Sequence, residues 1–222
     1  MRSILPFLLA CLLIVPAAAR ASDILRDVAG TAGLDLGAAV CGLDDQDGDG
    51  DWELLVGAPG ADGTGQDAGR VFLWFGGTEF SLNADRTWEG QVGGEQFGHA
   101  VARIGDVDGD GTGDFAVGAP FSDATSADGG RVYVFYGGAP LSGTPDLVLE
   151  SPTSGGRFGW SVAALGDLDG DDRDDFAVGA PWADTAGIEA GAAYVYLGAA
   201  GGPATSRSEE HTSELQSLLI IS

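Results

Sequence analysis

Residues 106–120 read Asp106-Val-Asp-Gly-Asp-Gly-Thr-Gly-Asp114-Phe-Ala-Val-Gly-Ala-Pro120, and residues 167–181 repeat this pattern as Asp-Leu-Asp-Gly-Asp-Asp-Arg-Asp-Asp-Phe-Ala-Val-Gly-Ala-Pro. A third copy occupies residues 45–59, and successive Gly-Ala-Pro motifs lie 61 residues apart. Three units therefore stand in register without an insertion. Such self-similarity at a fixed period is typical of repeat architectures and therefore determines the fold class.

Short apolar or alternating runs bounded by Gly, Asp and Pro predict three strands in each unit. In the second unit they are 100–104, 115–118 and 131–136, and in the third 161–165, 176–179 and 192–197. Weaker runs at 86–89 and 147–150 predict a fourth strand. Helical periodicity is absent from this region, and 38 glycines interrupt the chain too often for long helices.

Four strands in about 60 residues predict an all-β fold built from β-propeller blades of four antiparallel strands. We expect three blades, at 36–96, 97–157 and an incomplete 158–206. Because three blades cannot close a ring, the sequence is interpreted as a truncated propeller whose remaining blades are missing partners of the same chain. Residues 22–35 form a lead-in, in which 24–28 could supply a ring-closing strand.

Alternating carboxylates lie between the first two strands of each blade and predict three metal sites. Acidic residues at positions 1, 3, 5 and 9 of a tight turn, with a backbone carbonyl at position 7, offer an all-oxygen shell that suits Ca²⁺ better than Mg²⁺ or Zn²⁺. We expect up to three Ca²⁺ ions, one per blade. The candidate ligands are Asp45, Asp47, Asp49, Asp51 and Glu53, then Asp106, Asp108, Asp110, Thr112 and Asp114, and finally Asp167, Asp169, Asp171, Arg173 and Asp175.

The pattern of these loops admits two other interpretations. An EF-hand needs a Glu at position 12 between two helices, whereas Val56, Val117 and Val178 stand there inside strands. The loops could instead be solvated acidic turns, but four or five carboxylates converging three times without a cation would repel one another. Asp172 replaces a loop glycine in the third blade, and Glu53 replaces the final Asp in the first, so these two sites could differ in geometry.

Phe97-Gly98, the aspartate loop and Gly118-Ala119-Pro120 together resemble the FG-GAP repeat of integrin alpha-chain propellers and their bacterial relatives. The resemblance covers residues 36–198, with Leu36 in place of the first Phe. It implies a seven-bladed ring, Ca²⁺ in loops on one face, an extracellular location, and adhesion or binding of a protein or glycan ligand. Similar repeats also resemble those attached to an exported phospholipase D, so an accessory propeller of a hydrolase is the alternative function. A purely structural array is a third interpretation.

The two ends of the chain are predicted to lie outside the fold. Residues 1–21 have the charged, apolar and small-residue regions of a signal peptide, which predicts a secreted or cell-surface protein without a transmembrane segment. Residues 207–222 are interpreted as an artefactual tail, because 207–217 resemble a translated sequencing adapter; a genuine short amphipathic tail is the alternative. The net charge of −24 argues against nucleic acid as a partner, since both would be polyanions.

Nothing in the sequence predicts an enzyme. His99 has no partner set for catalysis, and Cys41 is expected to be a small buried residue. Phe121 and Trp182 follow their Gly-Ala-Pro motifs at equivalent positions and could form an exposed patch on a loop face, although we favour packing between blades.

Overall fold

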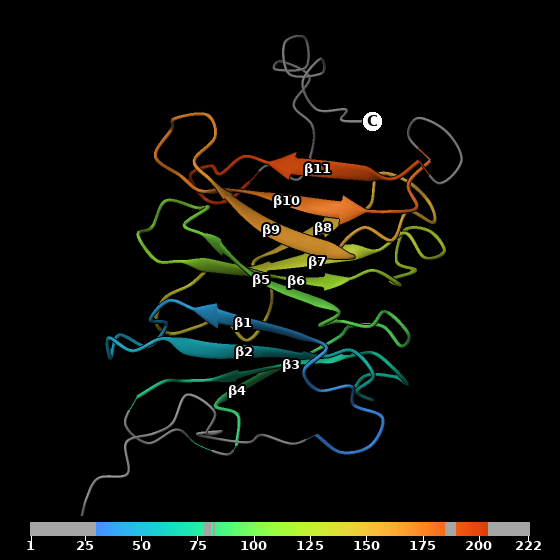
Figure 1. Ribbon diagram of the computed structural model, residues 1–222, viewed down its shortest axis with the longest axis horizontal. Coiled ribbons are helices and arrows are strands. Elements are labelled where there is room, and N and C mark those ends of the chain that lie inside the picture. The colour runs from blue at the N-terminus through green and yellow to red at the C-terminus, as the bar shows by residue number, and fades with distance from the viewer. Residues whose placement is uncertain (1–29, 78–80, 82, 185–189, 204–222) are drawn as a thin grey trace, which may run out of the picture.

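The computed structural model describes residues 30–77, 81, 83–184 and 190–203. The predicted signal peptide, the 24–28 strand and the 207–222 tail lie outside these residues. The described part is all-β, with eleven strands in three antiparallel sheets that stack along one direction (Figure 1). Within the described residues, no helix is long and apolar enough to span a bilayer.

Each predicted blade forms its own sheet, in which the strands pair in sequence order. We keep the term blade for these units, numbered one to three along the chain. Blade one contains β1 (Ala39–Leu43), β2 (Glu53–Ala58), β3 (Arg70–Trp74) and β4 (Arg86–Glu89); blade two contains β5 (Ala100–Gly105), β6 (Asp114–Ala119), β7 (Arg131–Phe135) and β8 (Leu147–Glu150); blade three contains β9 (Ser161–Gly166), β10 (Asp175–Ala180) and β11 (Ala192–Tyr196).

The seven strands predicted for blades two and three are all present, as is the outer strand predicted for blade one, and their ends differ from the predicted ones by at most one residue. The structure therefore confirms the all-β prediction and shows part of a β-propeller. The strands form because apolar residues alternate or run together between Gly-rich turns that end each element. The prediction of a seven-bladed ring concerns units beyond those described and stays a prediction.

The core lies between the sheets. One cluster of buried side chains joins blades one and two, and another joins blades two and three. Blade two contributes to both, because successive residues of a strand face opposite sides of the sheet. Thus Phe115 and Val117 of β6 pack toward blade one, whereas Ala116 packs toward blade three.

Neighbouring blades approach most closely at their first strands, where β5 contacts both β1 and β9. A side chain on Gly57 would overlap the carbonyl oxygen of Gly98, and Gly118 faces Gly159 in the same way. The glycines of the two repeated motifs are thus needed to let one backbone touch the next.

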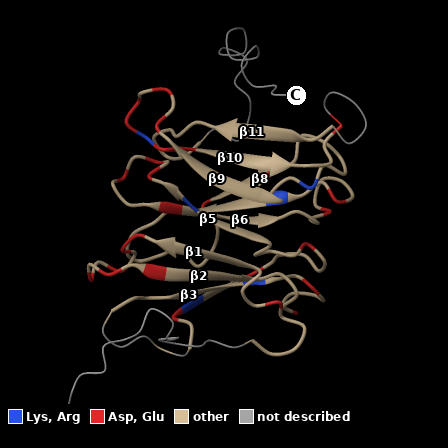
Figure 2. Cartoon of the chain, viewed as in Figure 1, with Lys and Arg blue, Asp and Glu red and all other residues tan. Residues whose placement is uncertain are grey.

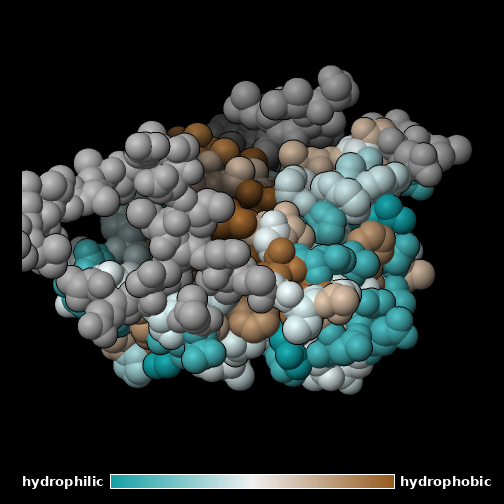
Figure 3. All heavy atoms as spheres, turned by 60° about the horizontal axis from the view of Figure 1, so that its bottom comes forward, coloured by the Kyte–Doolittle hydropathy of each residue, from teal (hydrophilic) through white to brown (hydrophobic). Residues whose placement is uncertain are grey.

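Apolar surface remains on the outer blades. On blade three, Leu165 and Leu168 are 39% and 58% exposed, whereas their equivalents in blade two, Ile104 and Val107, are 0% exposed. Figure 3 shows the stack from the blade-one side, with apolar atoms in the middle of the view and hydrophilic atoms beside them. Burial therefore depends on whether a neighbouring sheet covers the face.

Candidate metal centres

The acidic loops all lie at the same end of the three sheets. They connect the first and second strands of each blade at 44–52, 106–113 and 167–174, and we call them loops 1, 2 and 3. Figure 2 shows their acidic residues gathered along one side of the stack. Glycines with positive φ, such as Gly109 and Gly111, let each loop turn tightly. Asp172 has a φ of 67° where loops 1 and 2 have glycine, so the blade-three turn keeps the same conformation.

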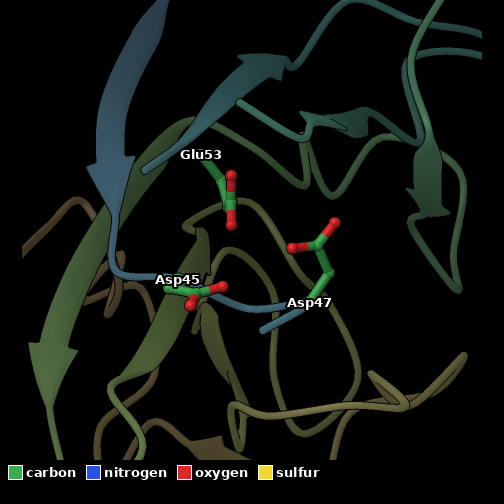
Figure 4. Close-up of side chains that lie close together, drawn as sticks. All are labelled: Asp45, Asp47 and Glu53. Carbon is green, nitrogen blue, oxygen red and sulfur yellow. The ribbon is translucent and has the colours of Figure 1, made fainter. Parts of the chain in front are cut away.

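Three carboxylates converge in every loop, at positions 1, 3 and 9. The groups are Asp45, Asp47 and Glu53; Asp106, Asp108 and Asp114; and Asp167, Asp169 and Asp175, with one oxygen of each residue within 4.8 Å of the others. Figure 4 shows the first group, with its carboxylates directed toward a shared space. We call them clusters 1, 2 and 3.

The carboxylate at position 1 organises its own loop. In loop 2, Oδ1 of Asp106 accepts from the backbone N–H groups of Gly109 and Asp110, at 2.8 and 3.0 Å, and Oδ2 accepts from Gly111 at 2.8 Å. Asp45 and Asp167 accept the corresponding bonds in loops 1 and 3. These backbone hydrogen bonds, led by that of Gly48, hold the pKa of Asp45 below its ordinary value.

The carboxylate at position 9 is buried at the start of the second strand. Asp114 is 1% exposed, and its two oxygens accept from the N–H groups of Val107 and Gly137, both at 2.8 Å. Burial, together with the nearby Asp108 and Asp106, raises the pKa of Asp114 to about 7. Glu53 and Asp175 are bound by backbone N–H groups in the same way.

The position 5 carboxylates are not members of the clusters. Each of them instead accepts a hydrogen bond from the backbone N–H of the residue at position 7. Asp51 donates to Asp49 at 2.8 Å, Thr112 donates to Asp110 at 2.7 Å, and Arg173 donates to Asp171 at 3.0 Å. In loop 3 the guanidinium of Arg173 also pairs with the Asp171 carboxylate at 2.8 Å. Loop 3 thus holds a positive side chain where loop 2 has Thr112.

These arrangements fit a hard divalent cation. All the donors are oxygens and one is buried. A positive ion at the centre of the cluster would offset the burial that raises the pKa of Asp114, and would relieve the smaller contribution from the nearby Asp108 and Asp106 carboxylates. The residues that would hold Ca²⁺ are those of the clusters, and the ion would supply a cross-link between the loop and the strand that follows it. This end of the sheets brings three carboxylates together in every described blade.

Aromatic side chains of blades two and three gather at the opposite end, around the turns that precede their first strands and follow their second strands. We call the five residues His99, Phe121, Arg157, Trp160 and Trp182 the aromatic–arginine cluster. The Arg157 guanidinium lies over the rings of Phe121 and Trp182, at 4.8 and 4.3 Å from their centroids. Trp160 contacts Trp182 at 4.7 Å and His99 at 4.4 Å between ring centroids. Burial lowers the pKa of His99.

The expected packing between blades is what Phe121 and Trp182 show, while an exposed patch that contacts a partner stays a prediction. They pack across the junction between blades two and three through Arg157, and both remain half-buried at the surface. Cys41 is half-buried rather than part of the core, and its Sγ accepts from the N–H of Arg103 at 3.1 Å.

Sequence reasoning missed a set of polar side chains that connect the loops. Gln46 is 2% exposed and bonds to blade two, Asp44 pairs with Arg103, and Asp174 accepts from the backbone of loop 2. The sequence could have pointed to Gln46, because this polar residue departs from the repeat and stands where blades two and three have the apolar Val107 and Leu168.

Comparison with known proteins agrees with this architecture. The family described as FG-GAP repeat matches residues 97–135 and 158–196. Integrin alpha-5 of Xenopus laevis is 38% identical over 120 residues, which cover 52% of this chain and 11% of the relative. Integrin alpha ina-1 of Caenorhabditis elegans is 36% identical over 156 residues, which cover 63% of this chain and 13% of the relative. Phosphatidylinositol-glycan-specific phospholipase D of Homo sapiens is 32% identical over 188 residues, covering 79% and 22%. The chain thus spans between about a tenth and a fifth of the length of these relatives.

Proposed function

Since the chain is an FG-GAP repeat protein of the integrin alpha-like kind, we propose that it is a non-catalytic, calcium-stabilised extracellular module that binds a protein or glycan ligand. The observation that carries this proposal is the repetition of one carboxylate cluster at the same end of three sheets. Calcium at clusters 1, 2 and 3 would hold that end rigid. The exported location rests on the signal peptide predicted from the sequence.

We expect the ions to stabilise the fold, because the described residues offer no covalent cross-link that could do so. Cys41 is the one cysteine among the described residues, so within them no disulfide is available to stabilise a secreted protein. An ion that binds the folded loops but not the unfolded chain stabilises the fold by about 1.4 kcal/mol at tenfold excess over its Kd. Three such sites would replace the missing covalent cross-links.

We assign ligand contact to the opposite end, at the aromatic–arginine cluster. Tryptophan and arginine are enriched among residues that dominate binding energy, and half-buried rings can contact a partner at little entropic cost. The rings come from two blades, so the surface forms only when the blades stack.

The test of the metal sites is a calcium titration by calorimetry with the whole chain and with the Asp47→Asn, Asp108→Asn, Asp169→Asn triple variant. We expect saturable binding near three ions, lost in the variant, and a melting temperature that rises with calcium only in the unaltered chain. A folded protein that binds no calcium would overturn the proposal.

The ligand surface is tested separately, on an array of glycans and extracellular proteins probed in calcium. A ligand that is bound by the unaltered chain and lost in Trp182→Ala would support the assignment. Trp52, which is 62% exposed on loop 1, provides the matched control because Trp52→Ala removes an exposed ring from the metal end. Equal loss in both variants would contradict the assignment.

A second candidate is an accessory propeller of an exported hydrolase. It is favoured by the phospholipase D relative, whose alignment covers 79% of this chain. Sequencing the full natural gene distinguishes the two functions, because a hydrolase requires a catalytic segment outside the residues described.

A further inference from the structure

Loops 1 and 2 are joined by the side chain of Gln46. Its Nε2 donates to the carbonyl oxygen of Gly113 at 2.9 Å, and its Oε1 accepts from the N–H of Gly138 at 3.3 Å. The backbone N–H of the same residue donates to Glu53 of cluster 1 at 2.9 Å. Since Gly113 directly precedes Asp114, this buried amide connects a ligand residue of cluster 1 to the chain beside a ligand residue of cluster 2.

Loops 2 and 3 are joined by Asp174. Its Oδ2 accepts from the N–H of Asp106 at 3.0 Å, and its own N–H donates to the carbonyl oxygen of Asp106, also at 3.0 Å. Asp106 carries the position 1 carboxylate of cluster 2, and Asp174 directly precedes Asp175 of cluster 3. The backbone of one ligand residue is thus fixed by the neighbour of another ligand residue in the next blade.

The junction of blades one and two and the junction of blades two and three each place a carboxylate beside a glycine, at different positions of the repeat. Asp174 stands at the repeat position of Gly113, and Asp44 stands at that of Gly105. A side chain on Gly113 would overlap the Asp44 carboxylate, and one on Gly105 would overlap that of Asp174. Each junction therefore has one carboxylate beside one glycine, supplied by the earlier blade at the first junction and by the later blade at the second.

Building on the proposed function, we propose that Gln46 and Asp174 couple neighbouring calcium sites, so that the three loops bind calcium cooperatively. An ion at cluster 3 orders loop 3 and with it Asp174, which then holds Asp106 in position for an ion at cluster 2. The entropy of ordering is shared between the sites, so the second ion binds more tightly than it would alone. Gln46 does the same between clusters 1 and 2.

The coupling is measured by titrating the whole chain with calcium and following each loop by NMR. The reporters are the backbone N–H groups of Gly50, Gly111 and Asp172, each of which donates to the position 1 carboxylate of its own loop. We expect Asp169→Asn, which disables cluster 3, to weaken calcium binding at loop 2 by about fivefold or more, the lower end of typical couplings. By reciprocity Asp108→Asn should weaken loop 3 by the same factor.

The residue-specific test repeats this comparison in an Asp174→Gly background, which places the blade-two residue at that position. The effect of Asp169→Asn on loop 2 should then fall below about twofold. Asp174→Asn, which retains an acceptor oxygen without the charge, should keep most of the coupling and separates hydrogen bonding from electrostatics. Asp123→Gly is the control, since it removes a carboxylate that accepts a backbone N–H at 2.8 Å in the connection between β6 and β7.

The outcomes distinguish this inference from the proposed function. Suppose that all three loops bind calcium and that Asp169→Asn weakens binding at loop 2 equally in the unaltered chain and in Asp174→Gly. This result would overturn the coupling role of Asp174 and would still support the metal sites. Absence of calcium-dependent shifts at every loop of the folded chain would overturn the metal sites and the coupling together.

Discussion

The strands β6 and β10 have the same sequence, Asp-Phe-Ala-Val-Gly-Ala, but different surroundings. All six residues of β6 are buried, whereas Ala177 and Gly179 of β10 are partly exposed. Ala116 and Gly118 of β6 face blade three, and the corresponding face of β10 meets no further sheet among the described residues. The repeat therefore determines the strand and its pairing, and the neighbouring blade determines how much each residue contributes to stability.

The largest expected effect comes from placing a charge on the equivalent faces. Ala116→Asp puts a carboxylate into an apolar junction where Ala116 is 0% exposed, and should lower the free energy of unfolding by at least about 3 kcal/mol. Ala177→Asp should cost less than about 1 kcal/mol, because its side chain reaches solvent. Urea unfolding followed by tryptophan fluorescence measures both.

The control variants for this comparison replace side chains on the opposite faces of β6 and β10, which are buried in both strands. Phe115 and Phe176 are both 0% exposed, so Phe115→Ala and Phe176→Ala should each cost about 3–5 kcal/mol. Equal costs for the two aspartate variants would mean that another surface covers β10 in solution.

A smaller effect is expected from the difference between loops 2 and 3. Arg173→Thr gives loop 3 the residue that loop 2 has and removes the guanidinium that pairs with Asp171. Calcium should then bind loop 3 several-fold more tightly, since about 1 kcal/mol of repulsion between cations corresponds to roughly a fivefold change in Kd. Calorimetry of the two proteins checks this, with Arg157→Thr as the charge-matched control; an unchanged affinity would show that Arg173 does not oppose the ion.

The smallest effect concerns pH at the opposite end of the blades. Burial lowers the pKa of His99 in the fold below its ordinary value of 6.5, so the unfolded chain takes up a proton at a higher pH than the folded chain. Stability is then fully present above pH 6.5 and is lost as the pH falls from there through the folded pKa. We expect His99→Phe to be less sensitive to acid over this window in melting experiments with constant calcium. The difference between the two curves isolates His99, and parallel curves would show that the pKa of His99 is the same in the folded and the unfolded chain.

Much of the fold could be predicted from the sequence because the repeat exposes it. Strand runs, Gly-rich turns and the aspartate spacing are local features, so the three sheets and the three carboxylate groups follow from residues close together in the chain. Position 5 shows the limit of that reasoning: whether Asp110 faces an ion or the backbone of Thr112 depends on the loop conformation, which alternating carboxylates do not determine.

The contacts between blades could not be predicted in the same way. Asp44 and Asp174 occupy different repeat positions and lie at equivalent places in successive junctions, because each faces a glycine of the neighbouring blade. Arg157 reaches Phe121 and Trp182 across 36 and 25 residues of sequence. Such pairings depend on how far apart the sheets lie, and only the exceptions to the repeat point to them.

The glycine contacts between blades also affect the angle at which successive blades pack. At the junction of blades one and two, Gly57 and Gly98 allow backbone to touch backbone near the first strands, while farther out the indole of Trp88 on β4 lies 5.5 and 5.3 Å from the rings of Phe115 and Phe135. This junction is therefore a wedge, thin beside the first strands and thick beside β4, and the contact of Gly118 with Gly159 keeps the next junction equally thin beside its first strands. The angle of that wedge, and hence the number of units in a full circle, depends on the difference in side-chain volume between the two edges. Leu149 at the Trp88 position of the next unit makes the second wedge chemically distinct from the first.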